Sequence, residues 1–137
     1  VATEIAFFFF STRFGGARRA YAMLIAGALF AILRWILMAS TTSTILIFIG
    51  QALHAFTFAA THLGAIFALT QLVGETRRAQ AQGWISGANA LTTALVSVLS
   101  GPLWQAYGLT AYLFMCGVAG LGLVLAMAAA LDPRKDD

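Results

Sequence analysis

A single arginine lies deep inside an apolar stretch of the chain, in the segment Ala31-Ile32-Leu33-Arg34-Trp35. A charged side chain at the centre of a membrane helix costs at least about 2.5–3.5 kcal/mol on insertion scales, so it rarely faces lipid. We therefore expect Arg34 to face the interior of a helix bundle and to bind a carboxylate, a substrate anion or carbonyl oxygens. In the alternative interpretation Arg34 extends to the membrane surface, because the apolar stretch ends soon after it, at Ser40.

Three further side chains in apolar stretches have the chemistry to carry a proton: Glu4, His54 and His62. A carboxyl group in the membrane interior favours its neutral form, and histidine titrates near neutral pH. The alternatives are that Glu4 lies near a helix end and that both histidines are hydrogen-bonded interior residues. The histidines are eight residues apart, without a cysteine or an acidic residue on the same predicted helix, so their spacing does not favour a metal site.

Polar residues follow one face of two predicted helices. On the helix with the histidines, a stripe comprises Gln51, His54, Thr57 and Thr61, with His62 at its edge. On the next helix, a continuous line comprises Gln82, Ser86, Asn89, Thr93, Ser97 and Ser100. Such stripes are expected beside a water-filled path, although Ser and Thr also serve helix–helix hydrogen bonding. We predict that both stripes line a path for a solute or for protons, with His54 as the strongest candidate because it is central to its stripe.

The composition places these residues in a membrane. Of 137 residues, 61% are hydrophobic and only 9% are charged, against about 25% charged in soluble domains. This excludes a water-soluble globule and a disordered chain, and the single Cys116 excludes a disulfide framework. The sequence has no phosphate-binding loop, nucleophile elbow, paired carboxylates or zinc cluster, so we expect no enzyme activity, no cofactor and no metal. The loop arginines lack interleaved aromatic residues, so we expect no nucleic-acid partner.

The apolar blocks predict an all-α helical bundle that crosses the membrane several times. A spanning helix takes about 20 residues, and no alternation of period two competes with the helical pattern. We predict spans at about residues 1–10, 20–39, 45–73, 81–100 and 109–131. The first block covers half a span, so we expect it to be the remainder of a helix cut on its N-terminal side. The polar linker Ser40–Thr44 separates the second and third spans, and Gly101-Pro102 is expected to end the fourth.

Basic residues alternate between the predicted loops. Seven of the eight lie in the first loop, the third loop and the C-terminal tail: Arg13, Arg18, Arg19, Arg77, Arg78, Arg134 and Lys135. The other two loops have none. By the positive-inside rule these basic segments and the C-terminus are expected on the cytoplasmic side of a bacterial inner membrane.

Several segments carry a family resemblance, in matching order and orientation. They are Ser11–Arg19, Leu33–Trp35, Gln51–Phe58, Thr61-His62 and Ser100–Trp104 with Tyr107-Gly108. The chain resembles the C-terminal half of a major facilitator superfamily transporter, from within helix eight to beyond helix twelve. Within it the chain resembles the 3-phenylpropionic acid transporters, a group similar to lactose permease and the nucleoside–proton symporters. The first segment resembles the cytoplasmic loop motif of the superfamily, with Thr12 where Asp usually stands.

The resemblance implies a twelve-helix fold and proton-coupled uptake by alternating access. Its implied partners are the lipid bilayer, a small-molecule substrate such as an aromatic carboxylate, protons and the N-terminal half of the same transporter. Arg34 matches a helix-nine arginine that controls proton release, and His54 matches a helix-ten histidine of the sugar-binding and coupling network. Thr57 stands where lactose permease has its proton-carrying glutamate, and Glu4 is not the direct equivalent of the helix-eight glutamate. The carrier is then Glu4, His54, His62 or a residue of the other half.

The loop arginines are expected to set the topology and to brace a cytoplasmic gate: Arg13, Arg18, Arg19, Arg77 and Arg78. Two other functions are compatible with the sequence. A sugar or nucleoside symporter would use hydrogen-bonding and stacking groups such as Gln51, Asn89 and Trp35. A non-transporting membrane subunit or sensor would tolerate the loss of Arg34 and His54 without a change in uptake.

Overall fold

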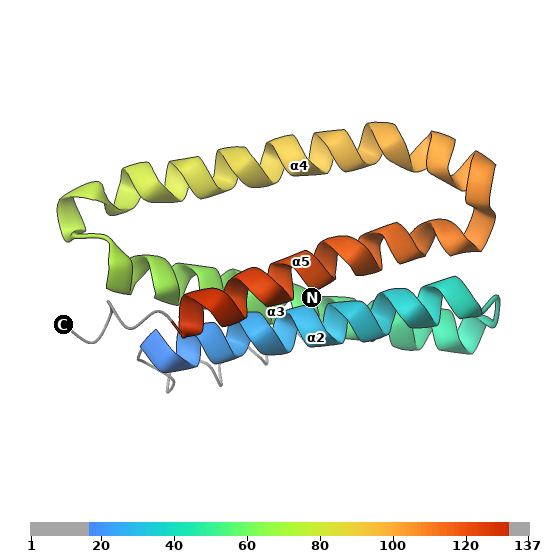
Figure 1. The fold of residues 1–137 in the computed structure, drawn as a ribbon, viewed down its shortest axis with the longest axis horizontal. Coiled ribbons are helices and arrows are strands. Elements are labelled where there is room, and N and C mark those ends of the chain that lie inside the picture. Colours follow the sequence, from blue (N-terminus) through green and yellow to red (C-terminus); the bar gives the residue numbers. More distant parts are fainter. Residues whose placement is uncertain (1–16, 132–137) are drawn as a thin grey trace.

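The computed structural model describes residues 17–131. Long α-helices account for most of this part of the chain: α2 (Ala17–Ser40), α3 (Thr44–Leu72), α4 (Arg78–Tyr107) and α5 (Tyr112–Ala130). Two short 3-10 helices join the later ones: η1 (Glu75–Arg77) and η2 (Gly108–Ala111). No strand occurs among the described residues (Figure 1). The predicted all-α fold is confirmed.

The helices are long and apolar enough to cross a membrane. Three helical segments of the described chain meet this condition, at residues 19–40, 44–72 and 75–130. The last of these turns back at η2, and Figure 1 shows α4 and α5 running in opposite directions on either side of the turn. At 1.5 Å per residue, α4 is about 45 Å long and α5 about 28 Å, against a hydrocarbon core of about 30 Å. The chain is therefore a multi-pass membrane protein.

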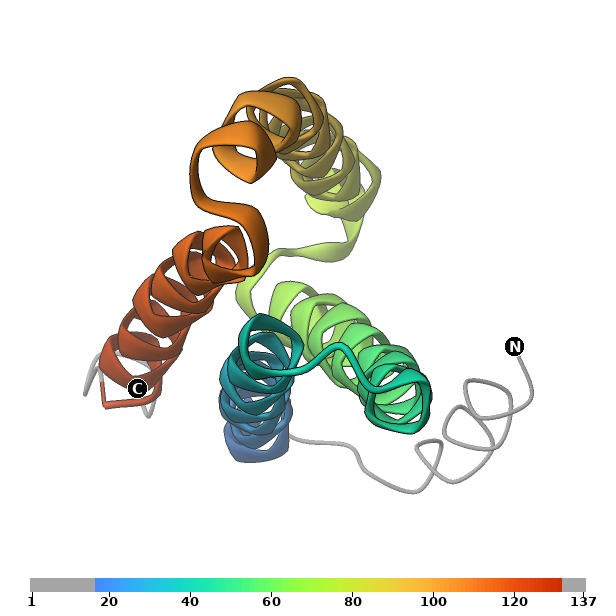
Figure 2. The ribbon, with the colours of Figure 1, turned by 90° about the vertical axis from the view of Figure 1, so that its right-hand side faces the viewer.

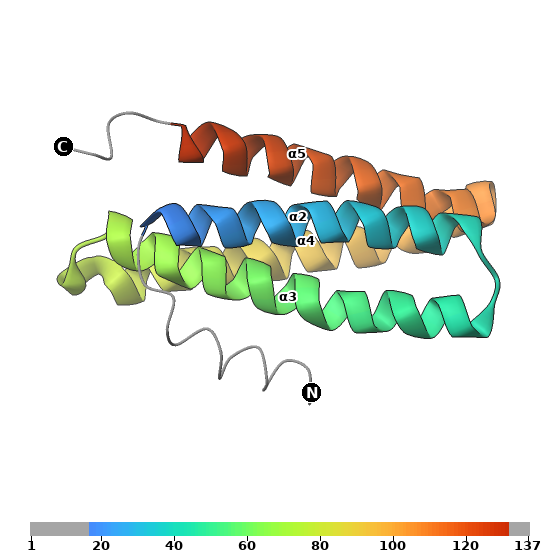
Figure 3. The same ribbon diagram turned by 90° about the horizontal axis from the view of Figure 1, so that it is seen from below.

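The basic segments within the described residues gather at one end of the bundle. The start of α2, the link between α3 and α4, and the last turn of α5 lie at this end, and the α2–α3 and α4–α5 turns lie at the other (Figures 1 and 3). Arg19, Arg77 and Arg78 belong to this basic end. Arg13, Arg134 and Lys135 lie outside the described residues. The side of the membrane on which the basic end lies remains a prediction.

Small residues bring α2 and α3 into close contact. A Cβ atom on Gly27 would lie 2.6 Å from the Thr61 methyl carbon, and one on Gly64 would lie 3.0 Å from the Ala20 carbonyl oxygen. Ala20, whose carbonyl oxygen forms part of this contact, is fully buried. Because membrane helices associate through van der Waals contact rather than the hydrophobic effect, this close approach is what holds the pair together.

Helix α5 packs on α2 as well, whereas α4 stands apart from the α2–α3 pair (Figure 2). No residue of α4 is buried, and Trp84, Leu91 and Val98 on α4 are each more than 60% exposed. A helix with large exposed apolar side chains and no buried face suits lipid or further protein helices as neighbours.

Helix α4 does not end at Gly101-Pro102, so that prediction from the sequence was wrong. The helix continues through Pro102 to Tyr107. Proline removes one backbone hydrogen bond, and membrane helices tolerate this loss because neighbouring helices, Ser or Thr side chains or local changes of the turn satisfy the freed backbone group. The helix ends at Tyr107, and the next residue, Gly108, adopts a φ of 55° and a ψ of −133° that residues with a Cβ atom rarely adopt.

Replacing Gly108 by alanine is expected to destabilise the α4–α5 turn by about 1–3 kcal/mol, because the left-handed backbone there becomes strained. The thermal midpoint of the purified protein should fall by several degrees. Gly101→Ala is the matched control, because a Cβ atom at this helical position meets nothing within 4 Å. An equal or larger fall for Gly101→Ala would show that the backbone conformation of Gly108 is not the cause.

Candidate functional site

The centre of the candidate site is a contact between two helices. Arg34 on α2 is only 9% exposed, and its Nη1 atom lies 2.8 Å from Nδ1 of His54 on α3. The guanidinium carbon lies 4.0 Å from the centre of the Trp35 ring, a cation–π distance. Arg34 Nε is buried and has no hydrogen-bond partner among the described residues. Arg34 thus lies against α3 and does not extend to the end of α2.

The Arg34–His54 hydrogen bond defines the protonation state of the imidazole. A guanidinium has only donors, so Nδ1 of His54 must accept the bond with its lone pair. His54 is then neutral, with its proton on Nε2. A doubly protonated imidazole has no lone pair at Nδ1. Formation of the Arg34–His54 bond and protonation of His54 are therefore mutually exclusive.

The predicted polar stripe of α3 divides between two surroundings. Thr57 is 5% exposed, and its hydroxyl donates to the His54 carbonyl oxygen at 2.9 Å. Thr61 lies against Gly27 and donates to the Thr57 carbonyl oxygen at 2.8 Å. Both hydroxyls are satisfied by their own helix, so they can be buried against α2 at little cost. Gln51, His54 and His62 have exposed side chains, although His54 keeps its bond to Arg34.

Phe58 connects the two histidines along α3. The His54 and Phe58 ring centres are 6.4 Å apart, and those of Phe58 and His62 are 5.7 Å apart with the planes inclined by only 8°. The three rings are spaced by four residues each, so they lie one above another on the helix. Phe58 was not among the predicted site residues because it is not polar, although its four-residue spacing from both histidines is visible in the sequence.

An aromatic groove begins at Trp35 and lies between α4 and α5. It has a volume of about 600 Å³, with almost entirely apolar walls that include Leu99, Trp104, Tyr112 and Phe114. Trp35 stacks on Tyr112 at 5.7 Å, and Trp104 meets Tyr112 edge to face at 5.9 Å. Trp35 therefore joins the cationic Arg34 to an apolar groove of a size that accepts a small organic molecule. No periodic pattern in the sequence indicates this groove, because its walls come from three helices.

The sequence model of the MFS_1 like family matches residues 1–115. The chain belongs to the MFS_1-like family. Comparisons with curated proteins and with solved structures gave no match. The predicted relation to the major facilitator superfamily is thereby confirmed, and the protein is of a transporter type rather than of an enzyme family. The matched residues include all of α2, α3 and α4, and so contain both Arg34 and His54.

The polar line on α4 of this MFS_1-like protein is internally hydrogen-bonded over its second half. The hydroxyls of Thr93, Ser97 and Ser100 donate to carbonyl oxygens three or four residues earlier, each at 2.8 Å. Asn89 is exposed, and Gln82 and Ser86 line a small pocket together with His62. The residues that remain candidates for lining a path are Gln51, His62, Gln82, Ser86 and Asn89.

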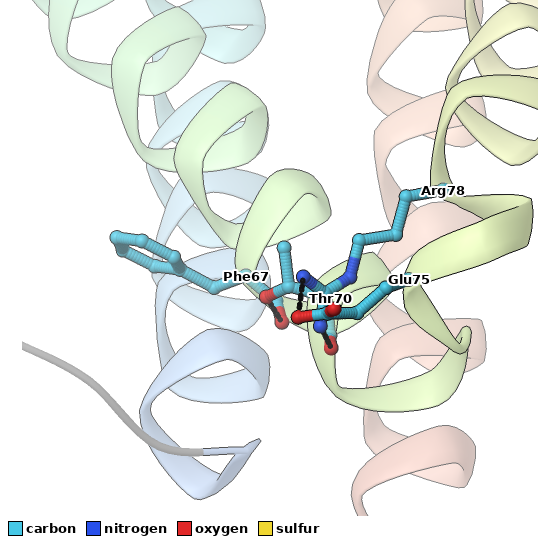
Figure 4. A network of polar contacts seen from close by, with 4 residues as sticks. All are labelled: Phe67, Thr70, Glu75 and Arg78. Atoms are coloured by element: carbon cyan, nitrogen blue, oxygen red, sulfur yellow. Dashed lines mark hydrogen bonds and ion pairs between the residues drawn. The ribbon is translucent and has the colours of Figure 1, made fainter.

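The remaining predicted site residues of the MFS_1-like protein lie at the basic end of the bundle or outside the residues that the structure describes. Glu4 and Arg13 are outside the described residues, as is the side chain of Arg18. Arg19 and Arg77 are exposed. Arg78 forms a local network in which it bonds the Thr70 carbonyl oxygen and the Glu75 carboxylate (Figure 4). Among the residues described, no cluster of three metal-ligating side chains occurs.

Proposed function

We propose that this MFS_1-like protein takes up a small organic solute together with protons, by alternating access. The observation that carries the proposal is the 2.8 Å hydrogen bond between Arg34 and His54. It places a permanent cation and a titratable base in direct contact, away from both ends of their helices. Charged and titratable residues inside membrane spans typically mark substrate or proton pathways.

The Arg34–His54 bond and the protonation of His54 exclude each other, and this couples proton binding to solute binding. When His54 takes a proton at Nδ1, it can no longer accept from Arg34. The Arg34 guanidinium is then released to bind an anionic group of the solute through two parallel hydrogen bonds. When the proton leaves on the other side of the membrane, Arg34 returns to His54 and the anion is displaced. Proton and solute thus bind and leave together.

We further propose that the solute is an aromatic carboxylate such as 3-phenylpropionate. Arg34 provides a partner for the carboxylate, and the aromatic groove that begins at Trp35 provides apolar contact for a ring. The resemblance to the 3-phenylpropionic acid transporters supports the same substrate class. In this proposal the chain acts together with the N-terminal half of a twelve-helix transporter in a bacterial inner membrane, with its C-terminus in the cytoplasm.

The test uses the full-length gene in cells without background uptake. We expect labelled 3-phenylpropionate to accumulate and a protonophore to abolish the accumulation. No uptake by protein that reaches the membrane would refute this substrate, and labelled sugars and nucleosides would then be tested in the same cells. Accumulation unaffected by the protonophore would refute the coupling to protons.

His54→Gln is expected to separate solute binding from proton coupling. A glutamine oxygen can still accept a hydrogen bond from Arg34, but the side chain cannot take a proton. Accumulation against a gradient should fall to the background level, whereas exchange of internal for external solute should continue. His62→Gln is the comparison, because His62 is not bonded to Arg34. Proton-driven accumulation that persists in His54→Gln would contradict the role of His54.

A further inference from the structure

A second polar pocket lies between α3 and α4, at the basic end of the bundle. Its volume is about 140 Å³, equal to roughly five waters at their liquid volume. The polar side chains that line it are those of His62, Thr70, Arg78, Gln82 and Ser86. None of the lining residues is acidic, and the rest of the wall is apolar. The pocket therefore presents one permanent cation together with other hydrogen-bonding side chains.

Arg78 has donors to spare in this pocket. Its Nη2 atom lies 3.3 Å from the Thr70 carbonyl oxygen and its Nη1 atom 3.4 Å from Glu75 Oε1, both beyond the usual range of N–H···O bonds. Arg78 Nε is shielded from solvent and bonds no other described residue. Glu75 is 86% exposed, so its ion pair with Arg78 is weak. Figure 4 shows Arg78 extending from the start of α4 to the end of α3, with Glu75 beside it.

The other polar groups differ in what they can offer to a ligand. The Thr70 hydroxyl already donates to the Phe67 carbonyl oxygen at 2.8 Å, so its proton is not available. The Gln82 amide and the Ser86 hydroxyl form no hydrogen bond with another described residue, and both line the pocket. An anion in the pocket would therefore receive hydrogen bonds from Arg78, Gln82 and Ser86.

The pocket lies at the depth where lipid headgroups are expected. Its outer end is where α3 ends at Leu72 and α4 begins at Arg78, and Trp84 in the second turn of α4 is exposed at the same end of the bundle. Tryptophan is enriched at the membrane–water interface. Ile85 is 46% exposed at the rim of the pocket, so an acyl chain can continue along α4. Basic pockets between membrane helices are known receptors for anionic lipid headgroups.

We propose that this pocket binds a phosphate group, with Arg78 as its charged ligand and an anionic phospholipid as its source. The Arg78 guanidinium matches the geometry of phosphate oxygens with two parallel donors. A bound headgroup would join the end of α3 to the start of α4, two helices that otherwise touch little.

The test measures thermal unfolding of the full-length protein in detergent with added phosphatidylglycerol, phosphatidylcholine or inorganic phosphate. At saturation, phosphatidylglycerol should raise the midpoint by about 5 °C more than phosphatidylcholine. Arg78→Gln should lose at least half of this difference. Protection by inorganic phosphate alone, equal to that by phosphatidylglycerol, would support the site and assign it to a free anion.

Two further variants separate the pocket from net charge and from misfolding. Arg19→Gln removes the same charge at the same end of the bundle, outside the pocket, and should keep the full lipid effect. Gln82→Leu keeps every charge and should weaken the effect, which provides a readout even where Arg78→Gln does not fold. Full protection in both pocket variants, or equal loss in Arg19→Gln, would overturn the proposal.

Discussion

Replacing Arg34 by alanine in the full-length protein is expected to reduce the initial rate of solute uptake about 100-fold. The substitution removes the donor to His54 and the proposed partner of the solute carboxylate, and a charge-assisted bond of about 3 kcal/mol corresponds to that factor. The measurement is the uptake of labelled 3-phenylpropionate in whole cells, normalised to the amount of protein in the membrane.

Two companion variants give this prediction its specificity. Arg34→Lys keeps the charge but loses the two-pronged donor and the contact over the Trp35 ring, so a loss of about 10-fold is expected. Leu33→Ala alters the neighbouring residue, which is 54% exposed, and should keep uptake within a factor of about two. Normal uptake in Arg34→Ala would contradict the proposed site and favour a membrane subunit or sensor.

Gly27→Leu is expected to have the largest effect on the fold. Even a single Cβ atom at Gly27 would lie 2.6 Å from the Thr61 methyl carbon and 3.3 Å from the Thr61 backbone nitrogen. The two helices must separate to admit a leucine, and overpacking of this kind costs about 3 kcal/mol. We expect the thermal midpoint of the purified protein to fall by about 10 °C.

A double substitution tests whether the Thr61 methyl group is the obstacle. Gly27→Ala alone should destabilise the protein, because threonine is stiff at χ1 and cannot turn its methyl group aside. Adding Thr61→Ser removes that methyl group and keeps the hydroxyl that bonds Thr57, so most of the stability should return. Gly83→Ala is the control, since a Cβ atom there meets nothing within 4 Å. The absence of rescue would place the obstacle in the backbone.

Much of the architecture was predictable from local properties of the sequence. Long apolar blocks must form helices in lipid, because every backbone polar group then finds its partner within the segment. Each crossing moves the chain to the other side of the membrane, so alternate loops were expected to lie together. The described Arg19, Arg77 and Arg78 do lie at one end of the bundle. The one clear error was the prediction that the helix ends at Pro102. Proline usually ends helices in soluble proteins, but a membrane environment favours continued helix.

The site itself was only partly predictable. The cost of a charge in lipid pointed to Arg34 as an interior residue, but its partner could not be inferred from α2 alone. Phe58 has no polar group and Tyr112 belongs to no polar stripe, so both residues were identified only through their ring contacts.

The sequence by itself determined the class of molecule, because hydrophobicity, helical period and charge placement are properties of each segment taken alone. It also carried the resemblance to the major facilitator superfamily that the MFS_1 like match confirmed. The tertiary structure alone decided that Arg34 meets His54, that Thr57 and Thr61 turn toward α2, and that Arg78 reaches the end of α3. These outcomes depend on the rotation and approach of one helix against another. That geometry is set by small residues such as Gly27 and Gly64, which let the two helices approach closely because they have no side chain.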